Sequence, residues 1–242
     1  MCCGRSRRGS CLNRRIHAID REYRIISALS GTGVPVPRVY LYCEDQAIAG
    51  AEFYIMDFLD GRVLVDPSLP NLDRDQRASI YAEMNRFVAE LHQVDYKTVG
   101  LGDYGRTGSY FARQIARWTR QARDSGMEDI PALEALMEWL PEHVPPGDET
   151  SLVHGDYRLD NLVFDKKELR AIGALDWELS TLGHPLADFS YNCLGWHIPA
   201  ALWRGMAGLD VVSLSIPDEK SYYVNTLRRP AGERSLGLLS RL

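Results

Sequence analysis

The stretch LVHGDYRLDNLVF, residues 152–164, decides the fold class because it sets polar residues at fixed spacing between two apolar runs. His154, Asp156 and Asn161 form the pattern H-x-D-x-x-x-x-N, and Asp176 stands twenty residues after Asp156. A polar surface turn would explain each of these residues singly. Their combined spacing favours a loop that handles phosphate and magnesium.

The residues after this loop predict a β-hairpin. NLVF (161–164) and RAIGALDW (170–177) are apolar runs on either side of the polar turn DKKE (165–168). Antiparallel pairing around this turn places Asn161 roughly opposite Asp176, with Cβ atoms about 5 Å apart. An amide oxygen and a carboxylate at that separation can share one Mg²⁺ ion, which prefers oxygen ligands and keeps water and phosphate oxygens alongside them.

Asp156 lies in the loop that leads into the hairpin. A carboxylate there can orient a substrate hydroxyl and accept its proton. His154 is expected to brace the loop by hydrogen bonds rather than to act as a base. The spacing is that of the kinase catalytic loop, although DWE at 176–178 replaces the usual D-F-G.

The rest of the chain predicts a strand-rich beginning followed by helices, which is typical of the α+β class with two unequal parts. Residues 17–31 are expected to form a helix with Ile19, Tyr23, Ile26 and Leu29 on one face. The other expected elements are strands at 34–45 and 51–59 with a turn near Ala49–Gly50, a turn-rich connector at 59–72, helices starting at an Asp73–Gln76 capping box, near 108–123 and at Pro131, a strand at 151–156, and a helix at 184–196.

Each of the three central helices is expected to bury one apolar face. The three faces are Ile80, Met84, Phe87, Val88 and Leu91, then Phe111, Ile115, Trp118 and Ala122, and then Leu133, Leu136, Met137 and Leu140.

Composition indicates an ordinary globular domain, with 45% hydrophobic and 25% charged residues among 242. No run of about 18 apolar residues predicts a membrane span, and the N-terminus lacks the apolar core of a secretory signal. The five cysteines are odd in number and form no C-x-x-C pair, which favours free thiols in the cytoplasm.

Charge is distributed unevenly along the chain. Residues 1–15 hold five Arg and no acid, so the net charge of −5 leaves −5 − 5 = −10 on the remainder. This acidic body argues against nucleic acid as a partner. Residues 1–16 are expected to form a disordered basic leader.

Three segments resemble the aminoglycoside phosphotransferase family of kinase-like enzymes, in particular the subgroup associated with acyl-CoA dehydrogenases. They are LVHGDYRLDNLVF, ALDWELSTLGHPLADFSY (174–191) and YFARQIARWTRQ (110–121), and the resemblance covers about residues 17–215. It implies a protein-kinase-like two-lobe fold, with a partial N-terminal lobe and hinge at 17–60. A mainly helical C-terminal lobe at 61–242 would contain the catalytic hairpin (151–178).

The resemblance also implies roles for residues in the C-terminal lobe. Asp156 would be the catalytic base, and Asn161 and Asp176 would bind Mg²⁺. Asp188 would brace the catalytic loop, although a helix cap is an equally good reading. Arg158 either pairs with Asp160 on the surface, which is the favoured reading, or meets the substrate.

On the nucleotide side, YIMDFLDG (54–61) would be the hinge, whose backbone contacts adenine near Met56, Asp57 and Phe58. Glu22 would be the helix glutamate that pairs with a phosphate-binding Lys. The plainer readings are strand core for Met56 and Phe58 and a solvated helix residue for Glu22.

The implied activity is ATP-dependent transfer of a phosphoryl group to a hydroxyl of a small molecule, with Mg²⁺ and in functional association with an acyl-CoA dehydrogenase. The alternatives are a catalytically impaired, pseudokinase-like fragment and a magnesium-dependent hydrolase that uses Asp156, Asp160 and Asp176. The beginning of the chain departs from the family, because no glycine-rich hairpin precedes Glu22 and the first lysine is Lys97. We therefore expect a truncated N-terminal lobe from a shortened or frame-disrupted gene.

Overall fold

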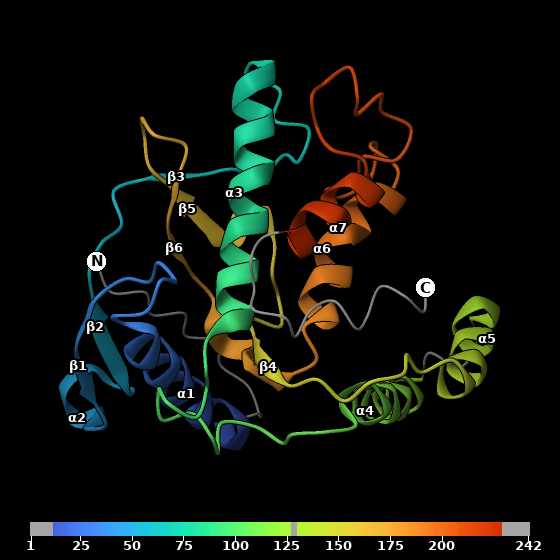
Figure 1. Cartoon of the computed structure of the whole chain (residues 1–242). Coiled ribbons are helices and arrows are strands. Elements are labelled where there is room, and N and C mark those ends of the chain that lie inside the picture. The colour runs from blue at the N-terminus through green and yellow to red at the C-terminus, as the bar shows by residue number, and fades with distance from the viewer. Residues whose placement is uncertain (1–11, 127–129, 229–242) are drawn as a thin grey trace.

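The computed structural model describes residues 12–126 and 130–228 and combines helices with three small antiparallel sheets, as the α+β class requires (Figure 1). The first part of the chain contains α1 (Leu12–Leu29), β1 (Val39–Cys43), α2 (Gln46–Ala49), β2 (Phe53–Met56), β3 (Arg62–Val63), α3 (Arg74–Gln93), α4 (Tyr110–Asp124), α5 (Pro131–Trp139) and the 3₁₀ turn η1 (Leu140–Glu142). The second part contains β4 (Ser151–Val153), η2 (Leu159–Asn161), β5 (Leu162–Phe164), β6 (Ala171–Ala174), η3 (Trp177–Leu179), β7 (Thr181–Gly183), α6 (Leu186–His197) and α7 (Glu219–Arg228).

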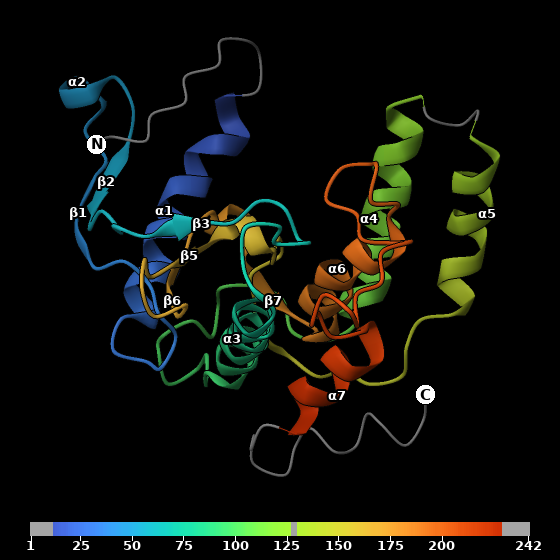
Figure 2. The ribbon, with the colours of Figure 1, turned by 90° about the horizontal axis from the view of Figure 1, so that it is seen from above.

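The elements are arranged around α3. In Figure 2, α1, β1 and β2 gather on one side of the molecule and α4 and α5 on the opposite side, with α3 and the strands of the hairpin between them. The expected two unequal parts are therefore present. The smaller one consists, among the described residues, of α1 and the two-stranded β1–β2 sheet with α2 at its turn.

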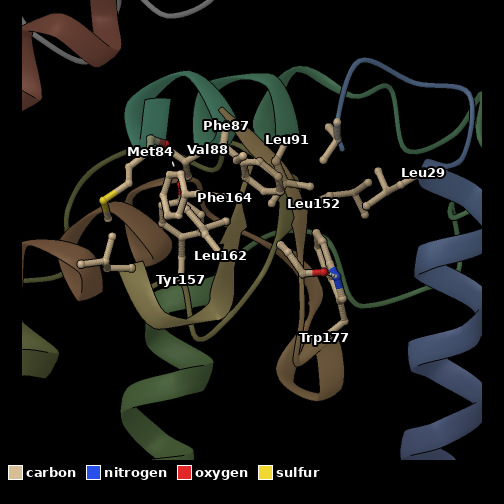
Figure 3. Close-up of a cluster of buried hydrophobic side chains, with 14 of the residues drawn as sticks. Leu29, Met84, Phe87, Val88, Leu91, Leu152, Tyr157, Leu162, Phe164 and Trp177 are labelled. Atoms are coloured by element: carbon tan, nitrogen blue, oxygen red, sulfur yellow. Dashed lines mark hydrogen bonds between the residues drawn. The ribbon is translucent and has the colours of Figure 1, made fainter. Parts of the chain in front are cut away.

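The core is centred on the apolar face of α3, as its spacing predicts. Met84, Phe87, Val88 and Leu91 are buried and face side chains from the hairpin, the catalytic loop and α1 (Figure 3). The Tyr157 ring stacks on Phe87 with centroids 5.9 Å apart, and its hydroxyl donates to the Met84 carbonyl at 2.6 Å. Burying each such side chain stabilises the fold by about 2 kcal/mol, so α3 fixes the loop that contains Tyr157.

The start of α3 confirms the predicted capping box. The Asp73 side chain accepts from the Gln76 backbone at 2.9 Å, and the Gln76 side chain accepts from the Asp73 backbone at 3.0 Å. Two backbone donors that the helix cannot satisfy are thereby satisfied.

The hairpin is formed by β5 and β6, and β3 adds a third strand to it. Arg62 pairs with Phe164, directly after the segment predicted to be the hinge. A Cβ atom on Gly61 would lie 2.5 Å from the Phe164 carbonyl oxygen, so only glycine allows the chain to pass this close to β5. The segment that follows β2 is therefore packed against the hairpin.

Several elements differ from the sequence-based expectation. α1 begins at Leu12, inside the range assigned to the leader, while residues 1–11 and the last 14 residues, 229–242, lie outside the described residues. The predicted turn at Ala49–Gly50 is the end of α2, and the connector contains β3. Further unpredicted elements are β7, which pairs with β4, the helix α7, and the 3₁₀ turns η2 and η3.

The apolar faces of α4 and α5 are less buried than predicted. Trp118 and Leu136 are 55% and 47% exposed, and Trp139 is 52% exposed. The prediction holds for the buried Ala122 and was wrong for Trp118 and Leu136, because these helices lie at the edge of the molecule, away from the core around α3 (Figure 2). Their rings are thus largely in contact with solvent.

Two further expectations concern the class of protein. Cys43 and Cys193 are free thiols, while Cys2, Cys3 and Cys11 lie outside the described residues. Among the helices that the structure describes, none combines the length and the apolar character needed to cross a bilayer.

Candidate active site

The loop between β4 and η2 is shaped by a glycine. Gly155 has φ +82°, and a Cβ atom there would lie 2.5 Å from the Leu179 carbonyl oxygen. An L-residue would therefore meet both backbone strain and a steric clash. The glycine lets the chain turn sharply after β4 and brings Asp156 to the end of the strand.

A buried carboxylate on α6 holds this loop. Asp188 Oδ2 accepts from the His154 backbone and Oδ1 accepts from the Gly155 backbone, each at 2.7 Å. His92 of α3 places Nε2 at 3.1 Å from Asp188 Oδ2. Burial alone would raise the pKa of Asp188. The hydrogen bond from His92, the charges of the His92 and His154 imidazoles and the bond from the His154 backbone lower it below its usual value. Asp188 braces the loop, as one of its two sequence readings proposed, and His92 supports Asp188 from α3.

His154 is fully buried and serves the loop structurally, as expected. Its Nε2 lies 3.0 Å from the Leu175 carbonyl oxygen, and its Nδ1 accepts from the Asp156 backbone at 3.3 Å. Burial lowers the pKa of His154, so the neutral imidazole is favoured. The imidazole thus links the catalytic loop to the end of β6.

Asp156 and Asn161 are in direct contact. Asn161 Nδ2 donates to the Asp156 carbonyl oxygen at 2.7 Å and to Asp156 Oδ2 at 3.0 Å. Because the amide nitrogen is used in this way, the amide oxygen of Asn161 is the atom left to bind a cation. The sequence spacing predicted the proximity of these two residues but not the hydrogen bond between them.

The strand register differs by one residue from the expected one. Leu162 pairs with Ala174, and Leu175 donates to the Asn161 carbonyl at 2.9 Å, so Leu175 rather than Asp176 lies opposite Asn161. Asp176 follows in the left-handed region, with φ 66° and ψ 56°. This conformation is strained for a non-glycine residue and redirects the chain immediately after the strand.

Asp156 and Asp176 both lie beside the buried His154 imidazole, because the Asp156 backbone donates to His154 Nδ1 and His154 Nε2 lies 3.0 Å from the carbonyl oxygen of Leu175, the residue before Asp176. Among the described residues, no three His, Cys, Asp or Glu side chains converge on a point suited to a metal ion. The Asn161 amide oxygen and the Asp176 carboxylate are the groups at this end of the hairpin that could hold a cation. Mg²⁺ suits such a sparse set because it keeps several waters and binds substrate phosphates.

Glu22 of α1 contacts the backbone next to Asp176. Its Oε1 accepts from the Trp177 N–H at 3.2 Å. Burial, helped by the nearby charges of Asp176 and Glu178, raises the pKa of Glu22, although the Trp177 and Tyr54 hydrogen bonds oppose this. Glu22 is thus a half-buried group at the site rather than a solvated helix residue.

The predicted hinge residues are the last residue of β2 and the first two residues of the segment between β2 and β3. Met56 is half-buried at the end of β2, the Asp57 backbone donates to the Arg38 carbonyl at 2.8 Å, and Phe58 is 80% exposed. Phe58 is therefore not strand core. The Asp57 amide is occupied by Arg38, which leaves the backbone of Met56 and Phe58 as the groups that a base could meet.

Four residues near Asp156 were not singled out as one group from the sequence. Arg158 Nη2 lies 2.8 Å from Asp156 Oδ2, Tyr191 hydrogen-bonds Asp156, and Arg204 forms an ion pair with Asp160. The ring of Trp203 covers the Arg204 guanidinium at 4.1 Å. No sequence signal joins residues so far apart along the chain. The predicted Arg158–Asp160 pair is present at 3.7 Å, but Arg158 also contacts the predicted base.

Comparison with known proteins shows the family to which this chain belongs. The model described as "Phosphotransferase enzyme family" (APH) matches residues 7–209, and the chain belongs to this family. A crystal structure of a provisionally named aminoglycoside phosphotransferase from Ralstonia eutropha superposes with a TM-score of 0.85 at 55% identity, over 89% of this chain and 67% of that chain. The chain therefore has the kinase-like phosphotransferase fold.

Two further similarities extend this result. Acyl-CoA dehydrogenase family member 10 of Mus musculus is 45% identical over 209 residues, which are 86% of this chain and 20% of the relative. The chain thus spans about a fifth of that relative's length. The streptomycin–ATP complex of APH(2'')-IIa shares the fold, with a TM-score of 0.54 at 19% identity over 72% of this chain and 60% of that one.

Proposed function

We propose that this protein transfers the γ-phosphoryl group of ATP to a hydroxyl of a small molecule, with Mg²⁺. The observation that carries the proposal is the contact between Asp156 and Asn161, with Asp176 at the end of the adjacent strand. A hydroxyl-orienting carboxylate beside two oxygen ligands for a cation is the arrangement that phosphoryl transfer needs, because positioning and charge neutralisation supply most of its catalysis.

In this proposal, Asp156 orients the acceptor hydroxyl and takes its proton as the oxygen bonds to the γ-phosphorus, while the bond from that phosphorus to the β-phosphate oxygen breaks and ADP leaves. Asn161 and Asp176 would hold Mg²⁺, which would supply neutralisation of the phosphate charge. Asp188 and His154 keep the loop in place and touch neither substrate. The backbone of Met56 and Phe58 meets the base, and the exposed Phe58 ring offers it an apolar surface.

ATP as the phosphoryl donor is supported by the streptomycin–ATP complex of APH(2'')-IIa, which shares the fold. The relation to an acyl-CoA dehydrogenase family member supports a functional association with such a dehydrogenase, which we include in the proposal. We place this activity in the cytoplasm.

A second candidate is a nucleotide-binding form with little or no turnover. It is favoured by Glu22, whose Oε1 accepts from the Trp177 backbone and which forms no ion pair with a lysine among the described residues. In the family such a glutamate would pair with a phosphate-binding lysine. Without that pair, the phosphates would be bound less tightly.

Titration calorimetry with MgATP, followed by product analysis, separates the candidates. We expect heat with wild type, loss of that heat in Asp176→Ala, and near-normal heat but no turnover in Asp156→Asn. Asp165→Asn, in the exposed hairpin turn, is the matched control and should behave as wild type. A phosphorylated acceptor identifies a transferase, free phosphate alone identifies the hydrolase, and MgATP binding without either product identifies the inactive form. Turnover by Asp156→Asn equal to wild type would exclude Asp156 as the base.

A further inference from the structure

We propose that Arg158 and Arg204 select an acceptor that carries an anionic group, a carboxylate or a phosphate, close to the hydroxyl that is phosphorylated. This inference rests on the proposed function and names the substrate class of the same site. We call Arg158 and Arg204 the arginine pair. The ring of Trp203 lies beside both guanidinium groups.

The arginine pair lies directly on the proposed base. Arg158 Nη2 is 2.8 Å from Asp156 Oδ2, and Arg158 Nε is 3.7 Å from Asp160 Oδ1. Arg204 contacts the other oxygen of Asp160, so this carboxylate joins the two guanidinium groups. Any acceptor whose hydroxyl reaches Asp156 therefore comes close to both positive charges.

The charges of this cluster do not cancel once the Asp156 carboxylate has accepted the proton of the acceptor hydroxyl. Before the reaction, Asp156 and Asp160 balance Arg158 and Arg204, since 2 − 2 = 0. When Asp156 takes up the proton of the hydroxyl, Asp160 alone remains against the two arginines, so 2 − 1 = 1 positive charge is left. This is a local exception in a chain of net charge −5. An acceptor with an anionic group compensates it, whereas an acceptor with ammonium groups is repelled.

The hydrogen-bonding capacity of the pair is also incompletely used. Arg158 Nε and Arg204 Nε and Nη1 have no hydrogen-bond acceptor among the described residues, although the three atoms are shielded from solvent. Leaving buried charged donors unpaired costs free energy. Bidentate contact with a carboxylate or phosphate is the interaction that suits a guanidinium group best.

The loop that carries Arg204 is built to hold it there. Arg204 has φ 55°, in the left-handed region that costs a non-glycine residue about 1 kcal/mol. Gly205 next to it packs so tightly that a Cβ atom would lie 2.2 Å from the Pro199 carbonyl oxygen. The loop is tied to α6, because Met206 donates to the Gly195 carbonyl at 2.7 Å. Strain at an arginine rather than at a glycine indicates that the side chain is needed at this point.

The same loop offers an apolar surface beside the charge. Leu202 and Trp203 are 62% and 60% exposed, and Trp203 lies 5.4 Å from the Arg158 guanidinium and 4.1 Å from that of Arg204. The preferred acceptor thus combines a hydroxyl, an anionic group and an apolar part. A polycationic aminoglycoside fits this surface poorly.

The test uses four probes with the same alkyl chain: hydroxyhexanoate, hexanediol monophosphate, hexanediol and aminohexanol. The ¹⁵N-detected Nε–H resonances of Arg158 and Arg204 report binding without requiring turnover. We expect them to shift with one or both acidic probes, which also distinguishes carboxylate from phosphate, and to stay unchanged with hexanediol and aminohexanol. Aminohexanol that shifts these resonances as strongly as hydroxyhexanoate, or acidic probes that leave them unmoved, would overturn the proposal.

Variants add an independent check. Arg204→Gln should weaken binding of the acidic probe by about tenfold, the loss expected for one charge-assisted contact. Arg204→Lys should restore part of it, and Arg120→Gln on the exposed face of α4 is the control that should leave it unchanged. Acid binding without phosphoryl transfer counts against the proposed function alone. Equal transfer to hydroxyhexanoate and aminohexanol counts against the charge selection alone.

Discussion

Asp188 on α6 accepts the backbone N–H of Gly155 at 2.7 Å, and so joins a helix of the C-terminal part to the centre of the catalytic loop. The other oxygen of the same carboxylate accepts from His154. Both acceptor atoms of one buried side chain are therefore committed to two successive peptide groups, which fixes the loop more strongly than one bond could.

Asp188→Asn should lower the free energy of unfolding by about 3 kcal/mol, because the amide nitrogen would face a backbone donor and leave it unsatisfied. Urea denaturation followed by circular dichroism measures the loss. Asp95→Asn is the matched control, since Asp95 also accepts from two backbone groups, of Lys97 and Thr98, but is exposed. Equal losses in the two variants would show that Asp188 is not a special brace.

Gly155→Ala should destabilise the fold by about 3 kcal/mol, which combines backbone strain with the clash against Leu179. Gly126 also has positive φ, at 66°, but a Cβ atom there would meet no atom of the described residues within 4 Å. Gly126→Ala should therefore cost only the strain, about 1 kcal/mol. Chemical denaturation of both variants measures how much the clash with Leu179 adds to the loss of free energy of unfolding. A loss in Gly155→Ala no greater than that in Gly126→Ala would show that the clash contributes nothing.

The low pKa of His154 predicts that stability falls in mildly acidic solution. The unfolded histidine takes up a proton near pH ~6.5, whereas the buried one stays neutral to lower pH. The unfolded state then binds more protons, so the free energy of unfolding decreases from pH ~6.5 downward, by up to about 1.4 kcal/mol per pH unit. Urea denaturation across this range should show the slope in wild type and a weaker slope in His154→Gln.

The control for this pH dependence is His197→Gln, because His197 is 65% exposed and lies far along α6 from the loop. That variant should keep the wild-type slope. If the slope disappeared in His197→Gln and survived in His154→Gln, the assignment of the pH dependence to His154 would be wrong.

Glu22→Gln should stabilise the protein at neutral pH by about 1 kcal/mol. Burial raises the pKa of Glu22, so the folded state binds the extra proton, and stability is lost as the pH rises from ~4.5 through the folded pKa. Glutamine keeps an acceptor for Trp177 without the charge. The gain should vanish toward pH ~4.5, and Glu44→Gln, at an exposed position, should show no comparable gain. Destabilisation by Glu22→Gln at neutral pH would contradict this account.

The local features of the fold were predictable because their causes lie close together in the sequence. The Asp73–Gln76 capping box, the buried face of α3 and the hairpin around residues 165–168 each depend on residues a few positions apart. The contact between Asp156 and Asn161 was predictable for the same reason, because the two residues lie five positions apart and are joined through one 3₁₀ turn.

The remaining features depend on contacts between distant segments. β3 and β7 have two and three residues and form only because β5 and β4 pair with them. The register of Asn161 depends on a bulge between Val163 and Phe164 that no residue type announces. Arg204 reaches the Asp156 region through a strained loop, and such long-range placement leaves no periodic signal in the sequence.

The pairing of β3 with β5 has a mechanical consequence. Arg62 is tied to Phe164 in the ladder, and Gly61 packs on the same strand, so the chain beyond residue 61 moves as one body with the catalytic hairpin. In the proposed function, residues 57–60 are then the short connection between the strand that meets the base and the hairpin that carries Asn161 and Asp176.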